Sequence, residues 1–442
     1  MRLNRANLAT MNHVEAKRAE ERIVHIGLGA FHRAHQAWYT SNVDSEQNWG
    51  IVAFTGRSID AAQKLAAQDG LFTLVTRDSN GDSYQIIDSI VRAEDGNNTE
   101  AFVDAITNSK TAIVTLTITE AGYGMDAAGH VDSANPPAAL HRLAVALETR
   151  RRANGLGIAI VSCDNMPSNA ALLKIAMGDL FASFGEESSD WLDEKVSFVS
   201  TSIDRITPKT TDEDLALVTK ATGWEDSSPV VTEPFSDWVL QGEFPLGRPQ
   251  WELAGAKFVD DIEPFENRKL WLLNGAHSLL AYLGQLLGHE TVAQSINDPV
   301  CRRSVEGFWN EAQNHLEQES LEIPKYRTAL LERFENSRIA HRLAQIAIDG
   351  ATKLRVRIAP VAKAELANKR DASACALVIA AWVAYVIKNE KVQDSQNEEI
   401  SRALQGDKSA VVQRLVSVID VQLANNSSFM KLVVDQLQTL EI

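Results

Sequence analysis

The sequence has little cysteine and no long apolar run. Its 442 residues include three cysteines, Cys163, Cys301 and Cys375, which lie far apart and form no CxxC pair. Scattered thiols argue against a disulfide framework and favour a reducing compartment such as the cytoplasm. The longest apolar run, residues 375–387, is too short to span a bilayer and is typical of a buried helix. The first twenty residues alternate charge and polarity, without the apolar stretch of a signal peptide.

Positive charge is also scarce. Lysine and arginine total 43 against 59 aspartates and glutamates, which gives a formal net charge of -16. A surface of that sign repels phosphate backbones and anionic lipid, so nucleic acids and membranes are disfavoured as partners. We expect a small-molecule partner instead. An anionic substrate or a cofactor phosphate would need dedicated basic residues near its site.

The pattern of predicted secondary structure changes near residue 262. The first part alternates helical patterns with β-branched runs, which predict strands at 23–26, 50–54, 72–76, 84–87, 111–118, 157–162 and 196–203. The second part is almost all helix-like, with helices expected at 264–287, 298–316, 324–334, 337–349 and 360–388. The fold class expected is α/β: a flexible N-terminal arm over 1–20, a Rossmann-type domain with a mostly parallel sheet over 21–262, and a mainly α-helical substrate and catalytic domain over 263–442. Domain interfaces are preferred pocket locations, so the active site is expected between the two domains.

A glycine turn directly follows the first predicted strand. Gly27 and Gly29 would let the backbone approach a pyrophosphate, which then sits at the N-terminus of the next helix. The third fingerprint position is His32 instead of glycine, and the usual acid after the second strand is missing. Arg57 stands near that place and could hold a 2′-phosphate, stack on adenine or have no role. The choice between NAD and NADP therefore stays open, and a turn without any ligand would give the same pattern.

The segment from residue 264 to 277 is the most informative. At 100° per residue of an α-helix, its polar side chains fall within an arc of about 140°; they are Glu266, Lys269, Asn274 and His277. Ketone reduction by hydride needs a proton donor and further donors aimed at the developing alkoxide. A buried lysine can serve as the acid or base, and an asparagine amide as the oxyanion donor. A solvated Glu–Lys pair beside a core histidine would look the same.

A second polar cluster, residues 162–165, ends a buried strand, where ligands of open α/β sheets bind. Asn165 is either a second oxyanion donor or an Asx-type helix cap. Cys163 is expected to be a small buried residue rather than a nucleophile. A zinc-dependent dehydrogenase is an alternative, with His32, His35 and Cys163 as ligands, although His-x-x-His alone is not a compact zinc spacing.

Taken together, these motifs resemble the polyol-specific long-chain dehydrogenases, the mannitol dehydrogenase family. The stretches that carry the resemblance are 27–36, 117–123, 162–165, 204–208, 233–235, the Lys269, Asn274, His277 spacing and 345–354. The resemblance runs from about residue 22 to about 390. It implies a metal-independent enzyme, monomeric or homodimeric, that moves hydride between NAD, with NADP not excluded, and a secondary alcohol or its ketone.

The resemblance also implies roles. Lys269 would be the general acid/base, Asn165 and Asn274 would polarise the carbonyl, and His277 would orient the substrate. Glu266 matches a carboxylate that controls water and proton access. The residues expected at the cofactor are Gly27, Gly29, Ala30, Phe31, Arg57, Thr119 and Glu120.

Within the family, residues 345–354 are most similar to fructuronate reductases, also called D-mannonate oxidoreductases, which reduce D-fructuronate with NADH. Lys353, Arg355 and Arg357 form a basic cluster in an acidic chain, and Lys353 and Arg355 are expected to bind a uronate carboxylate. A solvated basic strand or a structural ion pair is the alternative for this cluster. Mannitol 2-dehydrogenase and arabinitol dehydrogenase remain alternative activities, and a non-catalytic dinucleotide-binding sensor is the alternative outside enzymes.

Overall fold

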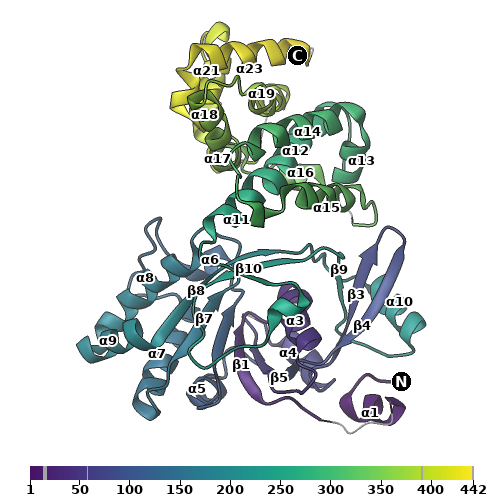
Figure 1. Ribbon diagram of the computed structural model, residues 1–442, viewed down its shortest axis with the longest axis vertical. Helices are drawn as coiled ribbons and strands as arrows, with labels where there is room; N and C mark the ends of the chain where they lie inside the picture. The colour runs from purple at the N-terminus through teal and green to yellow at the C-terminus, as the bar shows by residue number, and fades with distance from the viewer. Residues whose placement is uncertain (13–16, 57, 340, 390–391, 441–442) are drawn as a thin grey trace. The chain divides into compact units, whose positions relative to one another are not determined.

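The computed structural model describes residues 1–12, 17–56, 58–339, 341–389 and 392–440. The chain forms two compact units, Met1–Ile262 and Glu263–Ile442, coloured purple to teal and green to yellow in Figure 1. The first is an α/β unit and the second is helical, so the predicted fold class is confirmed.

The first unit is built on an eight-stranded sheet in the order β11-β10-β8-β7-β6-β1-β2-β5. The strands are β1 (Glu21–Ile26), β2 (Gly50–Phe54), β5 (Ile90–Glu94), β6 (Ile113–Leu116), β7 (Ile158–Ser162), β8 (Val196–Asp204), β10 (Asp237–Gln241) and β11 (Lys257–Phe258). Every neighbouring pair is parallel except β8 with β10. The mostly parallel sheet is as predicted, although β5, β10 and β11 are short and were not anticipated.

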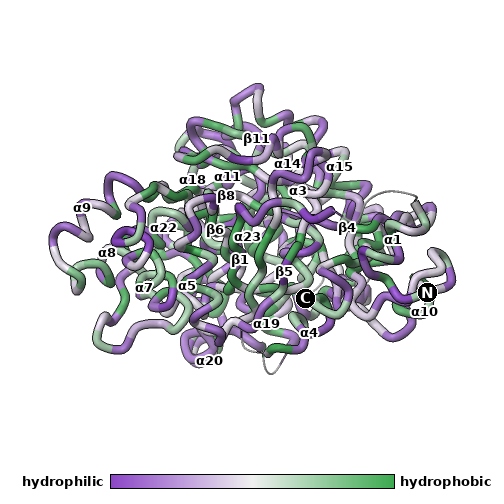
Figure 2. The backbone as a smooth tube through the Cα atoms, turned by 90° about the horizontal axis from the view of Figure 1, so that it is seen from below, coloured by the Kyte–Doolittle hydropathy of each residue, from purple (hydrophilic) through white to green (hydrophobic). Residues whose placement is uncertain are grey.

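Helices cover both faces of this sheet. Val24 and Ile26 of β1 point into a core with helices α5 (Thr99–Thr107), α7 (Ala138–Ala153) and α8 (Asn169–Phe181). Ile23 points into the opposite core, with α3 (Trp38–Val43) and α4 (Asp60–Ala66). Because side chains alternate along a strand, burial on both faces requires nearly continuous apolar strands. Colouring by hydropathy separates these strands from polar outer segments such as α9 (Glu186–Lys195) (Figure 2).

Smaller elements complete the first unit. A second sheet joins the hairpin of β3 (Phe72–Asp78) and β4 (Gly81–Ile87) to β9 (Val230–Thr232). Further helices are α6 (Glu120–Tyr123), α9 (Glu186–Lys195) and α10 (Asp212–Thr222), with 3-10 turns at Ala182–Phe184 and Trp251–Ala254.

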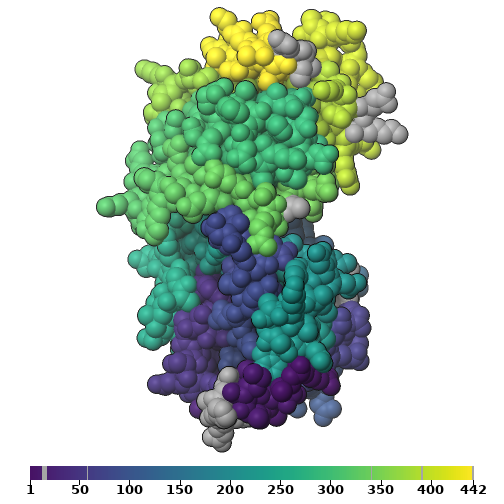
Figure 3. Space-filling view, turned by 90° about the vertical axis from the view of Figure 1, so that its right-hand side faces the viewer, coloured from purple at the N-terminus to yellow at the C-terminus, as the bar shows by residue number. Residues whose placement is uncertain are grey.

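The described part of the N-terminal arm contains a helix and buried contacts. Residues 5–12 form helix α1 (Arg5–Asn12), and the completely buried Leu3 packs with Leu71 and Trp224. The guanidinium of Arg5 donates to the carbonyls of Asp88 and Ile90. In Figure 3 the dark purple N-terminus lies on the surface of the first unit. Leu3 and Arg5 therefore hold the described start of the chain in place, which its polar composition does not indicate.

The second unit consists of helices. They are α11 (Glu263–Arg268), η4 (Lys269–Gly275), α12 (Ala276–Leu286), α13 (Val292–Asn297), α14 (Pro299–Gln313), α15 (Ile323–Glu335), α16 (Leu343–Ile346), α17 (Gly350–Arg357), α18 (Ala359–Ala367), α19 (Ser373–Lys388), α20 (Asn397–Leu404), α21 (Val411–Ile419), α22 (Val421–Ala424) and α23 (Ser427–Thr439), with 3-10 turns at Glu319–Leu321 and Lys408–Ala410.

The helix expected over residues 337–349 is wrong, because only Leu343–Ile346 is helical in the described part of that stretch. Arg342 is extended and forms a β-bridge with Thr291, which ends the helix on its N-terminal side. Within the described residues, no helix is long and apolar enough to cross a membrane.

Candidate active site

The glycine turn after β1 is tightly built. The backbone N–H groups of Gly27 and Leu28 both donate to the carbonyl of Phe54, each over 2.9 Å. Gly27 has φ +105°, and a Cβ there would overlap the carbonyl oxygen of Thr117. Only glycine fits this position, because its neighbour is rigid backbone of the adjacent strand end and its φ is positive.

The turn leads into a helix with open space at its start. Gly29 precedes α2 (Ala30–His32), which continues through the π-helical η1 (Arg33–Ala37) into α3. A Cβ at Gly29 would meet only the carbonyl of Gly27, 3.6 Å away. Ala30 begins the helix, and the Phe31 ring stacks on His35 at 5.1 Å. A helix N-terminus behind an open glycine suits a pyrophosphate, so these residues fit a dinucleotide.

His32, at the third fingerprint position, is fully buried beneath this turn. Its ring stacks on His25 with 3.3 Å between centroids. His25 lies 2.8 Å from Thr115 Oγ1 through Nδ1 and 3.0 Å from Thr117 Oγ1 through Nε2. Because Thr117 donates its own proton to the Gly27 carbonyl, it accepts from His25, which places the imidazole proton on Nε2. Burial lowers the pKa of His25 to about 3, so the ring is neutral. His25 and Thr117 thus brace the turn, a role that no sequence motif indicates.

Asp164 organises the loop after β6. Its carboxylate accepts hydrogen bonds from the N–H groups of Ile118 and Thr119, at 3.0 and 2.8 Å, and from the Tyr123 hydroxyl at 2.7 Å. Thr119 has φ +65°, a strained conformation for a β-branched residue. Burial raises the pKa of Asp164. This carboxylate therefore holds the backbone of Thr119, which is expected at the cofactor together with the adjacent, exposed Glu120.

Asn165 is exposed just beyond the carboxyl end of β7. The N-cap residue of α8 is Ser168, whose side chain makes no capping hydrogen bond. Asn169 orders the loop instead, donating to the carbonyls of Ser162 and Thr201 at 3.2 and 2.9 Å. Cys163 is buried, and burial raises the pKa of its thiol well above the usual value, so it is a poor nucleophile, as expected.

Two other expectations concern the first unit. Arg57 lies outside the described residues. Of the histidines considered as zinc ligands, His32 is stacked on His25 and His35 Nε2 lies 3.3 Å from the Asp237 carbonyl. No cluster of three or more His, Cys, Asp or Glu side chains in the described part of the chain is arranged to hold a metal ion.

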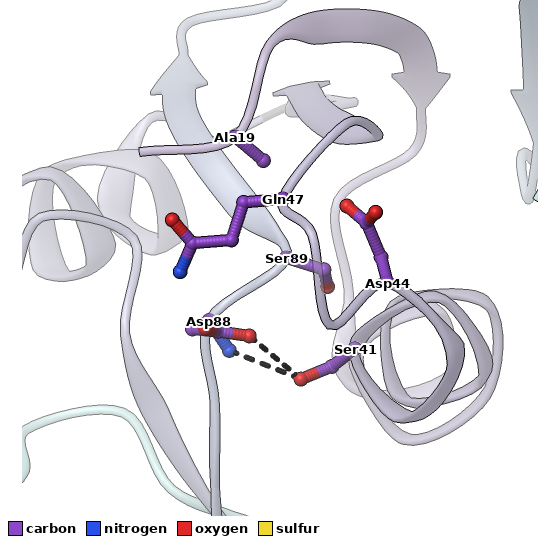
Figure 4. Close-up of a pocket in the computed structure, with 6 residues that line it drawn as sticks. All are labelled: Ala19, Ser41, Asp44, Gln47, Asp88 and Ser89. Carbon is purple, nitrogen blue, oxygen red and sulfur yellow. Dashed lines mark hydrogen bonds between the residues drawn. The ribbon is translucent and has the colours of Figure 1, made fainter. Parts of the chain in front are cut away.

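A small cavity in the first unit is not a substrate site. It measures about 10 Å³, which is room for one water molecule. Its lining includes Ser41, Asp44 and Asp88, and Ser41 Oγ donates to Asp88 Oδ1 over 2.8 Å (Figure 4). None of the predicted site residues lines it.

In the second unit, the predicted catalytic segment is not a regular α-helix. Lys269–Gly275 forms a π-helical segment, η4, between α11 and α12. The α-helical geometry assumed from the sequence is therefore wrong over this stretch. In a π-helix, residues five apart are bonded across one turn, so Lys269 and Asn274 lie closer together on one face than at the two ends of the arc predicted for an α-helix. This π turn explains why the lysine and the asparagine are five residues apart. Glu266, Lys269 and Asn274 are all half-buried.

Packing holds the π turn in place. The buried Trp309 donates its indole N–H to the carbonyl of Leu272 over 2.7 Å. A Cβ on Gly275 would lie 2.5 Å from the ring of Phe308, also fully buried. The glycine lets α14 approach closely, and the tryptophan satisfies a carbonyl inside the turn.

His277 lies one residue into α12 and is 8% exposed. Its ring contacts Phe334 and His341, with centroids 4.9 Å away in both cases. Burial, followed by the charges of His341 and Arg333, lowers the pKa of His277 well below its usual value, so the ring is neutral. Its Nε2 is buried and has no hydrogen-bond partner among the described residues. An unpaired buried nitrogen is costly, which makes it a candidate partner for a ligand hydroxyl.

The basic residues near residue 353 separate into two groups. Lys353 and Arg357 both act electrostatically on His277, and the Lys353 ammonium donates to the Ile346 carbonyl over 3.0 Å. Arg355 is exposed and donates to the carbonyls of Ile419 and Val418, at the end of α21. Lys353 therefore lies near His277, whereas the guanidinium of Arg355 binds carbonyls at the end of a different helix.

Comparison with known proteins identifies the family. Residues 21–253 match the mannitol dehydrogenase Rossmann domain, and residues 261–441 match the mannitol dehydrogenase C-terminal domain. The chain belongs to the mannitol dehydrogenase family. It is therefore an oxidoreductase, as the motifs predicted.

Three relatives illustrate the range of this family. D-mannonate oxidoreductase of Escherichia coli is 36% identical over 390 residues, which cover 83% of this chain and 80% of the relative. Mannitol 2-dehydrogenase of Pyrenophora tritici-repentis is 33% identical over 429 residues, covering 90% and 75%. The solved ternary complex of Pseudomonas fluorescens mannitol 2-dehydrogenase with NAD and D-mannitol has a TM-score of 0.79 at 31% identity, covering 100% of this chain and 97% of that one.

Proposed function

We propose that this chain reduces the ketone of a linear ketouronate, with D-fructuronate to D-mannonate as the lead reaction. It is an NAD-dependent oxidoreductase that acts on a secondary CH–OH group or its ketone, without a metal. The observation that carries the proposal is the single helical run that presents Lys269, Asn274 and the unpaired nitrogen of His277.

The residues of the chain have distinct parts in this reaction. NADH, if held at the turn of Gly27 and Gly29, would supply the hydride that reduces the carbonyl carbon. Lys269 gives its proton to that oxygen, which becomes the hydroxyl. Asn165 and Asn274 donate amide hydrogens to the developing alkoxide. His277, neutral because it is buried, bonds a substrate hydroxyl through Nε2. Glu266 controls the access of water and protons to Lys269.

Positive charge around His277 favours an acidic substrate over a neutral polyol. Lys353, Arg357 and Arg333 all act on its ring in a chain whose net charge is -16. A uronate carboxylate would be attracted to this group of cations, whereas a polyol needs only hydroxyl partners. The identity with D-mannonate oxidoreductase also supports this choice. Arg355 remains a second candidate for the carboxylate.

A substrate panel tests the proposal. Fructuronate, tagaturonate, fructose, mannitol and arabinitol would each be supplied with NAD(H) and with NADP(H), and absorbance followed at 340 nm. We expect the highest kcat/KM with fructuronate and NADH, retained after dialysis against EDTA. Highest efficiency with fructose or mannitol would replace the lead reaction by the mannitol 2-dehydrogenase activity. Cofactor binding without turnover of any compound would indicate a non-catalytic sensor.

Lys269 is tested by substitution. K269A should lower kcat by about 10²–10⁴-fold, the usual contribution of general acid–base catalysis, while NADH still binds. K325A is the matched control, because Lys325 is an exposed lysine of α15 in the same unit and pairs only with Glu322 among the described residues. A K269A variant as active as K325A would exclude the proposed mechanism.

A further inference from the structure

The carbonyl of Asn274 is held from outside its own helix. Arg357, the last residue of α17, donates from Nη1 to this carbonyl over 3.2 Å. The same nitrogen donates to Ser278 Oγ over 3.1 Å, and Ser278 Oγ in turn donates to the Asn274 carbonyl over 3.2 Å. Residues 274, 278 and 357 thus form a closed triangle of hydrogen bonds at the point where η4 passes into α12.

The partners of Arg357 are unusual for a guanidinium that is half-buried. The hydrogen bonds recorded for Arg357 within the described residues go to a neutral carbonyl and a neutral hydroxyl, and no carboxylate pairs with it there. Burial lowers its pKa to about 10, which still leaves it charged at neutral pH. Burying a cation without a counter-ion costs free energy, so we expect Arg357 to have a structural or functional role that offsets this cost.

The π turn explains what the bonds to Arg357 accomplish. A π segment shifts the register of the helix by one residue, so its carbonyls need donors from elsewhere at either end. Trp309 supplies one to Leu272 and Arg357 supplies one to Asn274. Without Arg357, the Asn274 carbonyl keeps only Ser278 Oγ as a side-chain donor, and we expect the turn to relax toward an α-helix, which would rotate the Asn274 amide away from the face of Lys269.

We propose that Arg357 is a positioning residue, which fixes the π turn so that the Asn274 amide and the His277 ring are aimed together at the substrate oxygen and hydroxyls. The inference rests on the proposed function. Arg357 acts through Asn274 and His277 and does not itself take part in the proton or hydride transfer. Its charge has a second effect on the same site, since it opposes protonation of His277.

The experiment compares three variants of the full chain. R357M removes the donor, and R357K restores the charge with an ammonium in place of the forked guanidinium. R414M is the matched control, because Arg414 likewise donates its guanidinium to backbone carbonyls, those of Ala403, Gln405 and Asp407, in the same unit. Hydrogen–deuterium exchange over residues 269–279 reports the turn, and kcat, KM and the Kd of NADH report the reaction.

We expect R357M to exchange at least about 10-fold faster over 269–279 and to lose at least about 10-fold in kcat, with the Kd of NADH unchanged. R357K should recover part of both losses, and R414M should match the parent in this segment. Unchanged exchange in R357M, or the same increase in R414M, would overturn the proposal. So would full kcat in R357M. If the parent turned over no compound in the panel, the proposed function would fail, and the exchange data would still decide the structural role of Arg357.

Discussion

His32 lies flat on His25, with ring centroids 3.3 Å apart and 8° between the ring planes. The dinucleotide fingerprint usually has glycine at this third position so that helix and strand can pack closely. Here a ring fills the space, and its partner ring is locked by Thr115 and Thr117. The stacked rings of His25 and His32 thus pack the helix against the strand, where the usual fingerprint relies on a glycine without a side chain.

Truncating His32 tests whether the stack supports the turn. H32A should lower the free energy of unfolding by about 2–4 kcal/mol, because it leaves a cavity in a fully buried site. Chemical denaturation measures the loss, and NADH titration should show weaker binding. H141A, at an exposed position of α7, should change stability by less than about 0.5 kcal/mol. Equal stability of the two variants would contradict a structural role for the stack.

Acid should destabilise the protein through its buried histidines. Burial lowers the pKa of His25 to about 3 and the pKa values of His32 and His277 well below 6.5. Below pH 6.5 the unfolded chain therefore binds protons that the folded chain does not, and the free energy of unfolding falls as the pH falls. Each histidine contributes up to about 1.4 kcal/mol per pH unit.

Urea titrations at pH 7, 6 and 5 measure this dependence. H277N should lose less stability between pH 7 and pH 5 than the parent, whereas the exposed-site variant H141N should follow the parent. A parent whose stability rises on acidification would show that these rings are not buried in the neutral form.

Two glycine-to-alanine substitutions should have opposite effects. G275A brings a methyl group to 2.5 Å from the Phe308 ring, so it should destabilise the protein by about 1–3 kcal/mol and lower kcat by moving the π turn. G178A, inside α8 with nothing within 4 Å, should stabilise by about 0.5–1 kcal/mol. Melting temperatures and kcat of the two variants check both signs, and a stabilising G275A would refute the close packing of α14 on the turn.

Replacing Asp164 tests the loop that carries Thr119. D164N keeps the shape but loses the charge that accepts two backbone N–H groups and the Tyr123 hydroxyl. It should cost about 1.5–3 kcal/mol of stability and raise the Kd of NADH. Y123F removes only the hydroxyl and should cost about 1 kcal/mol, with a smaller change in Kd. Identical NADH affinity in D164N and the parent would separate this loop from the cofactor.

Much of the architecture could be read from local patterns. The β-branched runs at 50–54 and 157–162 became strands with the same bounds or nearly so, because burial on both sheet faces demands continuous apolar residues. The strands β5, β10 and β11 were missed, because charged or polar residues interrupt the apolar runs of β5 and β10 and β11 has only two residues. The helix over 337–349 failed because a β-bridge between Arg342 and Thr291, 51 positions apart in the chain, overrides the local helical pattern.

The sequence alone determined the family, the order of the two units and the identity of the chemical groups, because those depend on residue types at short spacings along one strand or helix. Only the tertiary structure decided how these groups are held. The π turn depends on donors from Trp309 and Arg357. The neutral state of His277 depends on its burial near cations that are distant in the sequence. The glycine turn depends on His25 and Thr117. Each of these effects involves residues from separate helices or strands. The local sequence does not indicate which distant side chain will bond to a given carbonyl or shield a given ring from water.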